Sequence, residues 1–151
     1  MDQLATHGLR CKKSEGRHYR HRAINDILHR ALTTACIPSR LELPGLVCTD
    51  GKRPDGVTMI PWKNGKPIVW DPTCPDTLAW SYRHQATIRA GAVADLAEER
   101  KTDKYRYSSL GAGYSFTPVA IETFGAMGKR SLAFVRELSH RVMHCTGHGE
   151  V

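Results

Sequence analysis

The feature that most constrains the fold of this chain is an Asn-Gly pair set between two short apolar segments. Asn64 and Gly65 separate residues 56–60 from residues 67–71, and both segments are short and rich in residues that favour strands. Asn-Gly is a strong signal for a hairpin turn, because both turn residues must adopt positive φ. We therefore expect two neighbouring antiparallel strands at 56–60 and 67–71.

Helical patterns surround these two strands. Apolar residues recur every three to four positions in three longer segments, and Pro38 ends the first of them. The expected helices cover 19–36, 82–101 and 129–145, and two further strands cover 46–49 and 116–121. Pro118 favours an edge or a bulge for the last strand. The order α-β-β-β-α-β-α predicts an α/β fold: a single domain with a mixed four-stranded sheet flanked by helices.

Composition limits the class of protein. The chain has 151 residues and a formal net charge of +7, which suits one globular domain with a polyanionic partner. Its five cysteines are irregularly spaced and form no CxxC motif, so we expect reduced thiols in an intracellular protein. No apolar stretch is long enough to predict a membrane span.

Two aspartates stand at the ends of the expected hairpin strands. If these strands pair, Asp55 falls nearly opposite Pro72 and therefore beside Asp71. Phosphodiester hydrolysis uses such a carboxylate pair to hold Mg²⁺ or Mn²⁺. Glu42 and Asp26 compete as a third acidic ligand. The alternative interpretation is that both aspartates merely terminate strands, as aspartates often do in turns.

Five ordered sequence blocks resemble one known family. They are HGLRCKKSEGRHYRHRAINDILHRAL, GKRPDG, IVWDPT, AEERKTDKY and FTPVAIETFG. Together they resemble the C-terminal region of LINE-type (non-LTR) retrotransposon polyproteins, in which a zinc knuckle and a restriction-like endonuclease follow the reverse transcriptase. The resemblance runs from His7 to about His140, and it implies a nuclease of the PD-(D/E)XK type that nicks chromosomal DNA to prime reverse transcription.

The resemblance also suggests roles for individual residues. Asp55 and Asp71 would hold the metal ion. A restriction-like site usually has a lysine two residues after the second acid, but Thr73 stands there. The family's displaced lysine, followed by tyrosine, maps to Lys104 and Tyr105, which we expect to act in catalysis. The alternative for Lys104 is a solvated cation at a helix end.

Basic residues near the aspartates are the expected DNA contacts. They are Arg17, Arg20, His21, Arg22, Lys52 and Arg53. Contacts of this kind grip phosphates and carry little sequence information. Core packing or lid contacts account for the three tryptophans, Trp62, Trp70 and Trp80, more readily than base stacking does.

The resemblance divides the chain into three parts. Residues 1–18 form a basic segment left over from a zinc knuckle, 19–146 the endonuclease-like domain, and 147–151 a tail. His7 and Cys11 match only half of the knuckle, and since structural zinc takes four ligands we expect none here. The absent polymerase suggests a fragment or remnant of a longer polyprotein.

The expected partners are DNA and the RNA or reverse transcriptase of the parent element, with no membrane, and the expected location is the nucleus. Two rival hypotheses remain open: a catalytically inactive nucleic-acid-binding remnant, and a purely structural or protein-binding domain.

Overall fold

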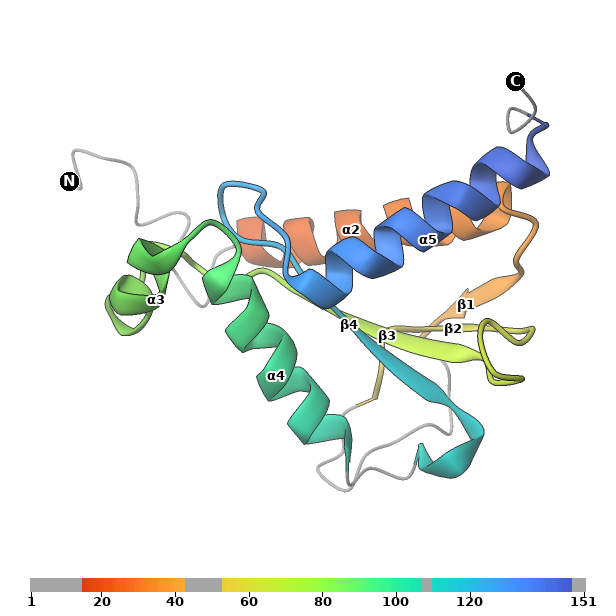
Figure 1. Ribbon diagram of the computed structural model, residues 1–151, viewed down its shortest axis with the longest axis horizontal. Helices are drawn as coiled ribbons and strands as arrows, with labels where there is room; N and C mark the ends of the chain where they lie inside the picture. The colour runs from red at the N-terminus through yellow and green to blue at the C-terminus, as the bar shows by residue number, and fades with distance from the viewer. Residues whose placement is uncertain (1–14, 43–52, 107–109, 148–151) are drawn as a thin grey trace.

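A computed structural model of the chain describes residues 15–42, 53–106 and 110–147 (Figure 1). The elements are α2 (Glu15–Thr34), β1 (Ser39–Leu41), β2 (Gly56–Thr58), β3 (Ile68–Thr73), the 3₁₀ helix η1 (Trp80–Tyr82), α3 (Arg83–Ile88), α4 (Ala92–Arg106), the 3₁₀ helix η2 (Gly111–Gly113), β4 (Ser115–Ala120) and α5 (Lys129–Cys145). The expected α/β class is confirmed: within these described ranges, four α-helices accompany one mixed sheet. The expected strand at 46–49 lies outside the described residues, and the strand before β2 in the sheet is β1.

The sheet has the strand order β1-β2-β3-β4. β2 pairs antiparallel with both β1 and β3, whereas β3 and β4 run parallel. Figure 1 shows α2 and α5 side by side on one face of the sheet and α4 on the opposite face. β4 is an edge strand, as Pro118 predicted, since a proline has no N–H for a second neighbour.

The turn between β2 and β3 forms as expected. Asn64 and Gly65 have φ values of 53° and 71°, and Lys63 pairs with Lys66 across the turn. The chain leaves β2 earlier than predicted, because the Thr58 hydroxyl bonds the carbonyl of Ile60 at 2.9 Å and so turns the chain away. The register places Gly56 opposite Trp70, one position from the expected alignment.

Successive side chains of β3 point to opposite faces of the sheet and enter two different hydrophobic cores. Ile68 and Trp70 pack with α2 and α5, whereas Val69 packs toward Tyr105 of α4. Asp71 follows the same alternation and therefore points to the α4 face. A Cβ at Gly56 would come within 2.0 Å of the Trp70 ring, so only glycine fits there.

The helix expected at 82–101 is two helices. α3 ends at Ile88 and α4 begins at Ala92, and between them Gly91 has a φ of +86°. A Cβ on Gly91 would lie 2.7 Å from the carbonyl oxygen of Met127. The break thus lets this turn pack closely against the loop before α5. The spacing of apolar residues in the sequence gives no sign of this contact.

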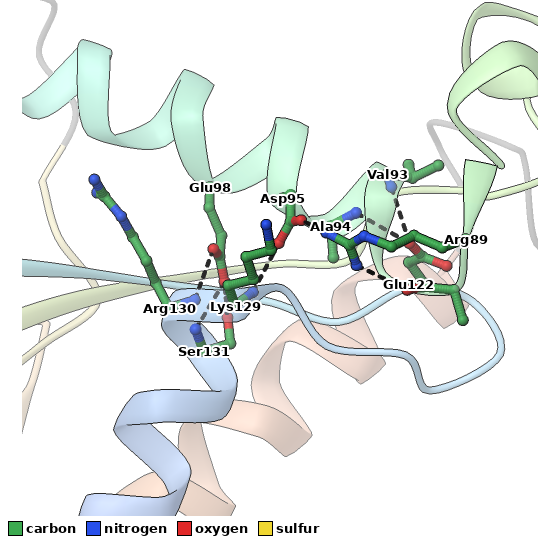
Figure 2. Close-up of polar contacts among 10 residues, drawn as sticks. Arg89, Val93, Ala94, Asp95, Glu98, Glu122, Lys129, Arg130 and Ser131 are labelled. Atoms are coloured by element: carbon green, nitrogen blue, oxygen red, sulfur yellow. Dashed lines mark hydrogen bonds and ion pairs between the residues drawn. The ribbon is translucent and has the colours of Figure 1, made fainter.

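Two buried glutamates hold the N-terminal ends of α4 and α5 (Figure 2). Glu122 accepts hydrogen bonds from the N–H groups of Val93 and Ala94 at 3.0 and 3.1 Å. Glu98 accepts bonds from the N–H groups of Arg130 and Ser131 at 3.0 and 2.8 Å. A helix N-terminus leaves its first N–H groups unsatisfied and favours negative charge. The carboxylates therefore cap both helices and fix where α4 lies against the sheet.

A disulfide joins the C-terminal ends of the two helices on the other face. Cys36 follows α2 and Cys145 ends α5, and their Cα atoms lie 6.5 Å apart. The expectation of reduced thiols is wrong for this pair. A separation of 109 residues leaves no local signal, since the pairing arises from the parallel packing of α2 and α5.

Candidate functional site

The two predicted aspartates come together at one end of the β2–β3 pair. Asp55 donates its N–H to the carbonyl of Trp70 at 3.0 Å, although the strand register pairs Trp70 with Gly56, so Asp55 and Gly56 both lie against Trp70. Asp55 thereby comes beside Asp71, and a carboxylate oxygen of each lies within 4.8 Å of the other. The pairing of β2 with β3 therefore brings both carboxyl groups to the same end of the two strands.

Helix α2 brings a histidine to this pair. Asn25 accepts a hydrogen bond from the indole N–H of Trp70 at 3.0 Å, which fixes the position of the helix against β3. His21 lies one turn earlier, and its Nε2 is 3.1 Å from Oδ2 of Asp55. The buried Asn25–Trp70 bond thus sets the distance between His21 and the carboxylates.

Helix α4 supplies two further groups from the other side. The Lys101 ammonium lies 2.8 Å from Oδ2 of Asp71, and the Tyr105 hydroxyl donates to the same oxygen at 2.7 Å. Lys101 and Tyr105 are four residues apart, so both lie on the helix face that covers β3. Tyr105 also stacks on Phe116 of β4, with ring centroids 4.3 Å apart, which holds its ring in place.

The pKa values of the two aspartates are shifted in opposite directions. Burial raises the pKa of Asp71, and the neighbouring Asp55 adds to this, although Lys101 and Tyr105 act in the opposite direction. Burial also works to raise the pKa of Asp55, but hydrogen bonds from His21 and Asp71 outweigh it and hold that pKa below its ordinary value. The hydrogen bond to Asp55 raises the pKa of His21 against the effect of burial. The aspartates are thus close enough to share a proton.

These residues could hold a metal ion. Ligand atoms of His21, Asp55 and Asp71 all lie within 4.8 Å of one another. Two carboxylates and an imidazole form a mixed oxygen and nitrogen donor set. Where two carboxyl groups share a proton, a divalent cation can take the place of that proton. Among the residues described, this group includes neither Glu42 nor Asp26, the two candidates for a third acidic ligand.

Lys104 and Lys101 make different contacts from α4. The Lys104 ammonium lies over the Tyr105 ring, 4.7 Å from the centroid, while Lys101 makes the ion pair with Asp71. Thr73 ends β3 on the same face as Asp71, two positions further along the strand. The lysine thus reaches the site from the helix that covers the strand.

The expected DNA contacts differ in their exposure. Arg22 and Arg53 are exposed and Arg20 is half-buried, while His21 is occupied with Asp55. Arg17 lies in the first turn of α2. Lys52 lies outside the described residues, and so do His7 and Cys11, the two residues that match half of a zinc knuckle.

The sequence did not predict the roles of Lys101 and His21. Lys101 was not expected to pair with Asp71, and His21 was expected to contact DNA and not Asp55. A signal for Lys101 was present, since the residue one turn before Tyr105 on an α-helix shares its face. His21 has a similar relation to Asn25, but only the docking of α2 on Trp70 reveals it.

Comparison with protein-family models finds no match for this chain, and a search of curated proteins finds none either. Within the part of the chain that the structure describes, no helix is both long and apolar enough to span a membrane.

Proposed function

We propose that this chain is a DNA endonuclease domain that depends on a divalent cation, and that it derives from a LINE-type retroelement with a PD-(D/E)XK-like fold. The observation that carries the proposal is the convergence of Asp55, Asp71 and Lys101 from three separate elements. Two acids and a lysine around one point are the groups that metal-assisted phosphodiester hydrolysis uses. The order of helices and strands is compatible with that fold.

Asp55 and Asp71, with His21 beside them, would hold Mg²⁺ or Mn²⁺. When bound, the cation would polarise the scissile phosphodiester and favour deprotonation of the attacking water. Lys101 places a fixed positive charge where negative charge develops in the transition state. Tyr105 positions Asp71 through its hydroxyl, and the exposed Arg22 and Arg53 contact neighbouring phosphates. The products are a nicked strand and a free 3′ end that primes reverse transcription, which agrees with a nuclear location.

A nicking assay on supercoiled plasmid tests the proposal. We expect nicking with Mg²⁺ or Mn²⁺ and none with EDTA. Asp55→Asn and Asp71→Asn should each lower the rate by about 100-fold or more, since each removes a ligand charge. Asp103→Asn is the matched control, because Asp103 is an exposed acid on α4 that pairs only three residues away with Arg106. Failure of the wild-type chain to nick, or nicking that survives Asp71→Asn, contradicts the proposal.

A second candidate is a nucleic-acid-binding remnant without turnover. It is favoured by the internal pairing of the site, in which Lys101 already neutralises Asp71 and His21 pairs with Asp55. It is also favoured by Thr73 at the usual lysine position. This candidate predicts DNA binding that weakens steeply with salt, with no nicking in either metal.

A further inference from the structure

The helical segment that follows β3 presents an aromatic and basic face to solvent. Trp80 in η1 is 79% exposed, and Ile88 at the end of α3 is 63% exposed. Arg83, His84 and Thr87 lie between them and are exposed as well. Their spacing of three to four residues puts all five on one side of the segment. We call this side the Trp80 face.

Trp80 differs from the other two tryptophans of the chain. Trp62 and Trp70 are 8% and 0% exposed and belong to the core between the sheet and α5. Core packing therefore accounts for Trp62 and Trp70 but not for Trp80. A large aromatic side chain that stands in solvent, unlike its counterparts, is typical of a binding surface.

Two contacts order this segment, one within it and one with α4. The Arg83 guanidinium lies over the Trp80 indole, 4.2 Å from its centroid. Arg100 donates a hydrogen bond to the Tyr82 hydroxyl at 2.7 Å and lies over that ring at 5.3 Å. Arg100 immediately precedes Lys101, so one turn of α4 carries both the site lysine and the anchor of this segment.

The charge of this segment indicates the chemistry of its partner. No acidic residue occurs between Asp76 and Asp95, whereas Arg83, His84 and Arg89 all lie there. An apolar protein partner does not require this excess of basic over acidic residues. A partner that offers both flat rings and phosphates matches the combination of an indole and guanidinium groups.

We propose that the Trp80 face binds an unpaired stretch of DNA strand next to the cleavage site, with a base stacked on Trp80 and Arg83 against the phosphates. This deepens the proposed function, because it names the form of the substrate. The rings of duplex bases are already stacked on their neighbours and are closed to an indole that projects from the surface. A strand with splayed bases supplies the free ring face.

Fluorescence anisotropy with a labelled short oligothymidylate tests this proposal on the full chain in EDTA. Trp80→Ala should weaken binding by about tenfold, while Trp80→Phe retains most of the affinity, because stacking on an aromatic ring tolerates a change of ring. Phe124→Ala is the matched control, since Phe124 is also a highly exposed aromatic residue, at 72%, but belongs to the loop before α5 and not to η1 or α3. Its affinity should equal that of the wild type.

Two comparisons show whether the partner is an unpaired DNA strand. A blunt duplex of the same length should bind Trp80→Ala and wild type within about twofold of each other. An equal loss on both substrates overturns the assignment to an unpaired strand, and a tenfold preference for the matching RNA overturns the assignment to DNA. Equal affinities of Trp80→Ala and wild type for the oligothymidylate, or no binding by the wild type, overturn the proposal as a whole.

Failure of this proposal can be told apart from failure of the endonuclease proposal. Binding is measured without metal, and Asp71→Asn should bind the oligothymidylate like the wild type even if it no longer nicks. A chain that binds the strand through Trp80 but never nicks supports the Trp80 face and contradicts only the endonuclease.

Discussion

Helix α4 takes part in two clusters of carboxyl groups, and the two clusters differ in the groups that donate hydrogen bonds to them. Glu98 and Glu122 accept hydrogen bonds mainly from backbone N–H groups at helix ends (Figure 2). Asp55 and Asp71 are satisfied by the side chains of His21, Lys101 and Tyr105. The first kind of donor cannot leave unless a whole helix undocks, whereas a side-chain donor can rotate away and admit another cation.

This difference separates a structural role from a functional one. The glutamate cluster fixes α4 against α5 and the β4–α5 loop, and a Cβ on Gly128 would come within 2.2 Å of Glu98, so the helix end fits closely around the carboxylate. In the aspartate cluster the Lys101 side chain is 25% exposed beside an Asp71 side chain that is 6% exposed. Buried negative charge with a partner that reaches solvent is an arrangement that a ligand can change.

The largest expected effect on stability comes from the glutamate cluster. Glu98→Gln replaces an acceptor oxygen with an amide NH₂ that faces the N–H groups of α5. We expect a loss of about 3 kcal/mol in the free energy of unfolding, because buried donors lose a charged acceptor. Urea denaturation followed by circular dichroism measures it. Glu99→Gln, one residue along and exposed, should stay within about 0.5 kcal/mol of wild type. Equal stability of the two variants contradicts the structural role.

Lys101→Met tests the aspartate cluster through activity. We expect the nicking rate to fall about 100-fold, since a fixed positive charge is lost where charge develops. Stability should fall by only about 1 kcal/mol, because Asp71 keeps its bond from Tyr105 and its raised pKa lets it take up a proton. Lys104→Met is the control and should nick within about twofold of wild type. The reverse outcome would restore Lys104 as the lysine of the site.

Local signals were sufficient for the aspartates and insufficient for their partners. Asn64-Gly65 predicts that β2 and β3 are neighbours, and their pairing brings Asp55 beside Asp71. Lys101 and His21 depend on how two helices dock, and docking is set by the Trp70–Asn25 bond and by packing that the helical pattern does not encode. The register was predicted one position off because the pairing of Lys63 with Lys66 at the turn and the pairing of Val57 with Val69 in the strands are not in one continuous register, so the turn does not fix the alignment of β2 with β3.

The glutamates show a further limit of prediction. Glu98 lies in an ordinary charged stretch of α4, yet it caps a helix that begins about thirty residues later. Glu122 belongs to the block FTPVAIETFG, to which the resemblance assigned no chemistry, and it caps a helix that begins well before it. Caps are recognised in a sequence from residues just before a helix, so a cap supplied from another element leaves no signal.

Metal binding should distinguish the two clusters directly. A cation that binds only the folded chain stabilises it by about 1.4 kcal/mol at tenfold excess over its dissociation constant. We expect Mg²⁺ or Mn²⁺ to raise the melting temperature of wild type and of Asp103→Asn, and to leave that of Asp55→Asn unchanged. Glu98→Gln should keep the shift, from a lower starting temperature. A shift that vanishes in Glu98→Gln but persists in Asp55→Asn would place the metal at the wrong cluster.

The smallest expected effect concerns the Tyr105 hydroxyl, which donates a hydrogen bond from α4 to Asp71. Tyr105→Phe removes one hydrogen bond at 2.7 Å but keeps the ring that stacks on Phe116 at 4.3 Å. Stability should fall by about 1 kcal/mol, as for one hydrogen bond to a charged group that retains a second partner. Nicking should slow by about fivefold, because Asp71 keeps its charge and Lys101 and loses only its alignment. Phe116→Leu, which keeps the hydroxyl but loses the stacking partner, separates the two contributions. If Tyr105→Phe abolishes nicking while Phe116→Leu does not, the hydroxyl touches the reacting groups and does more than position Asp71.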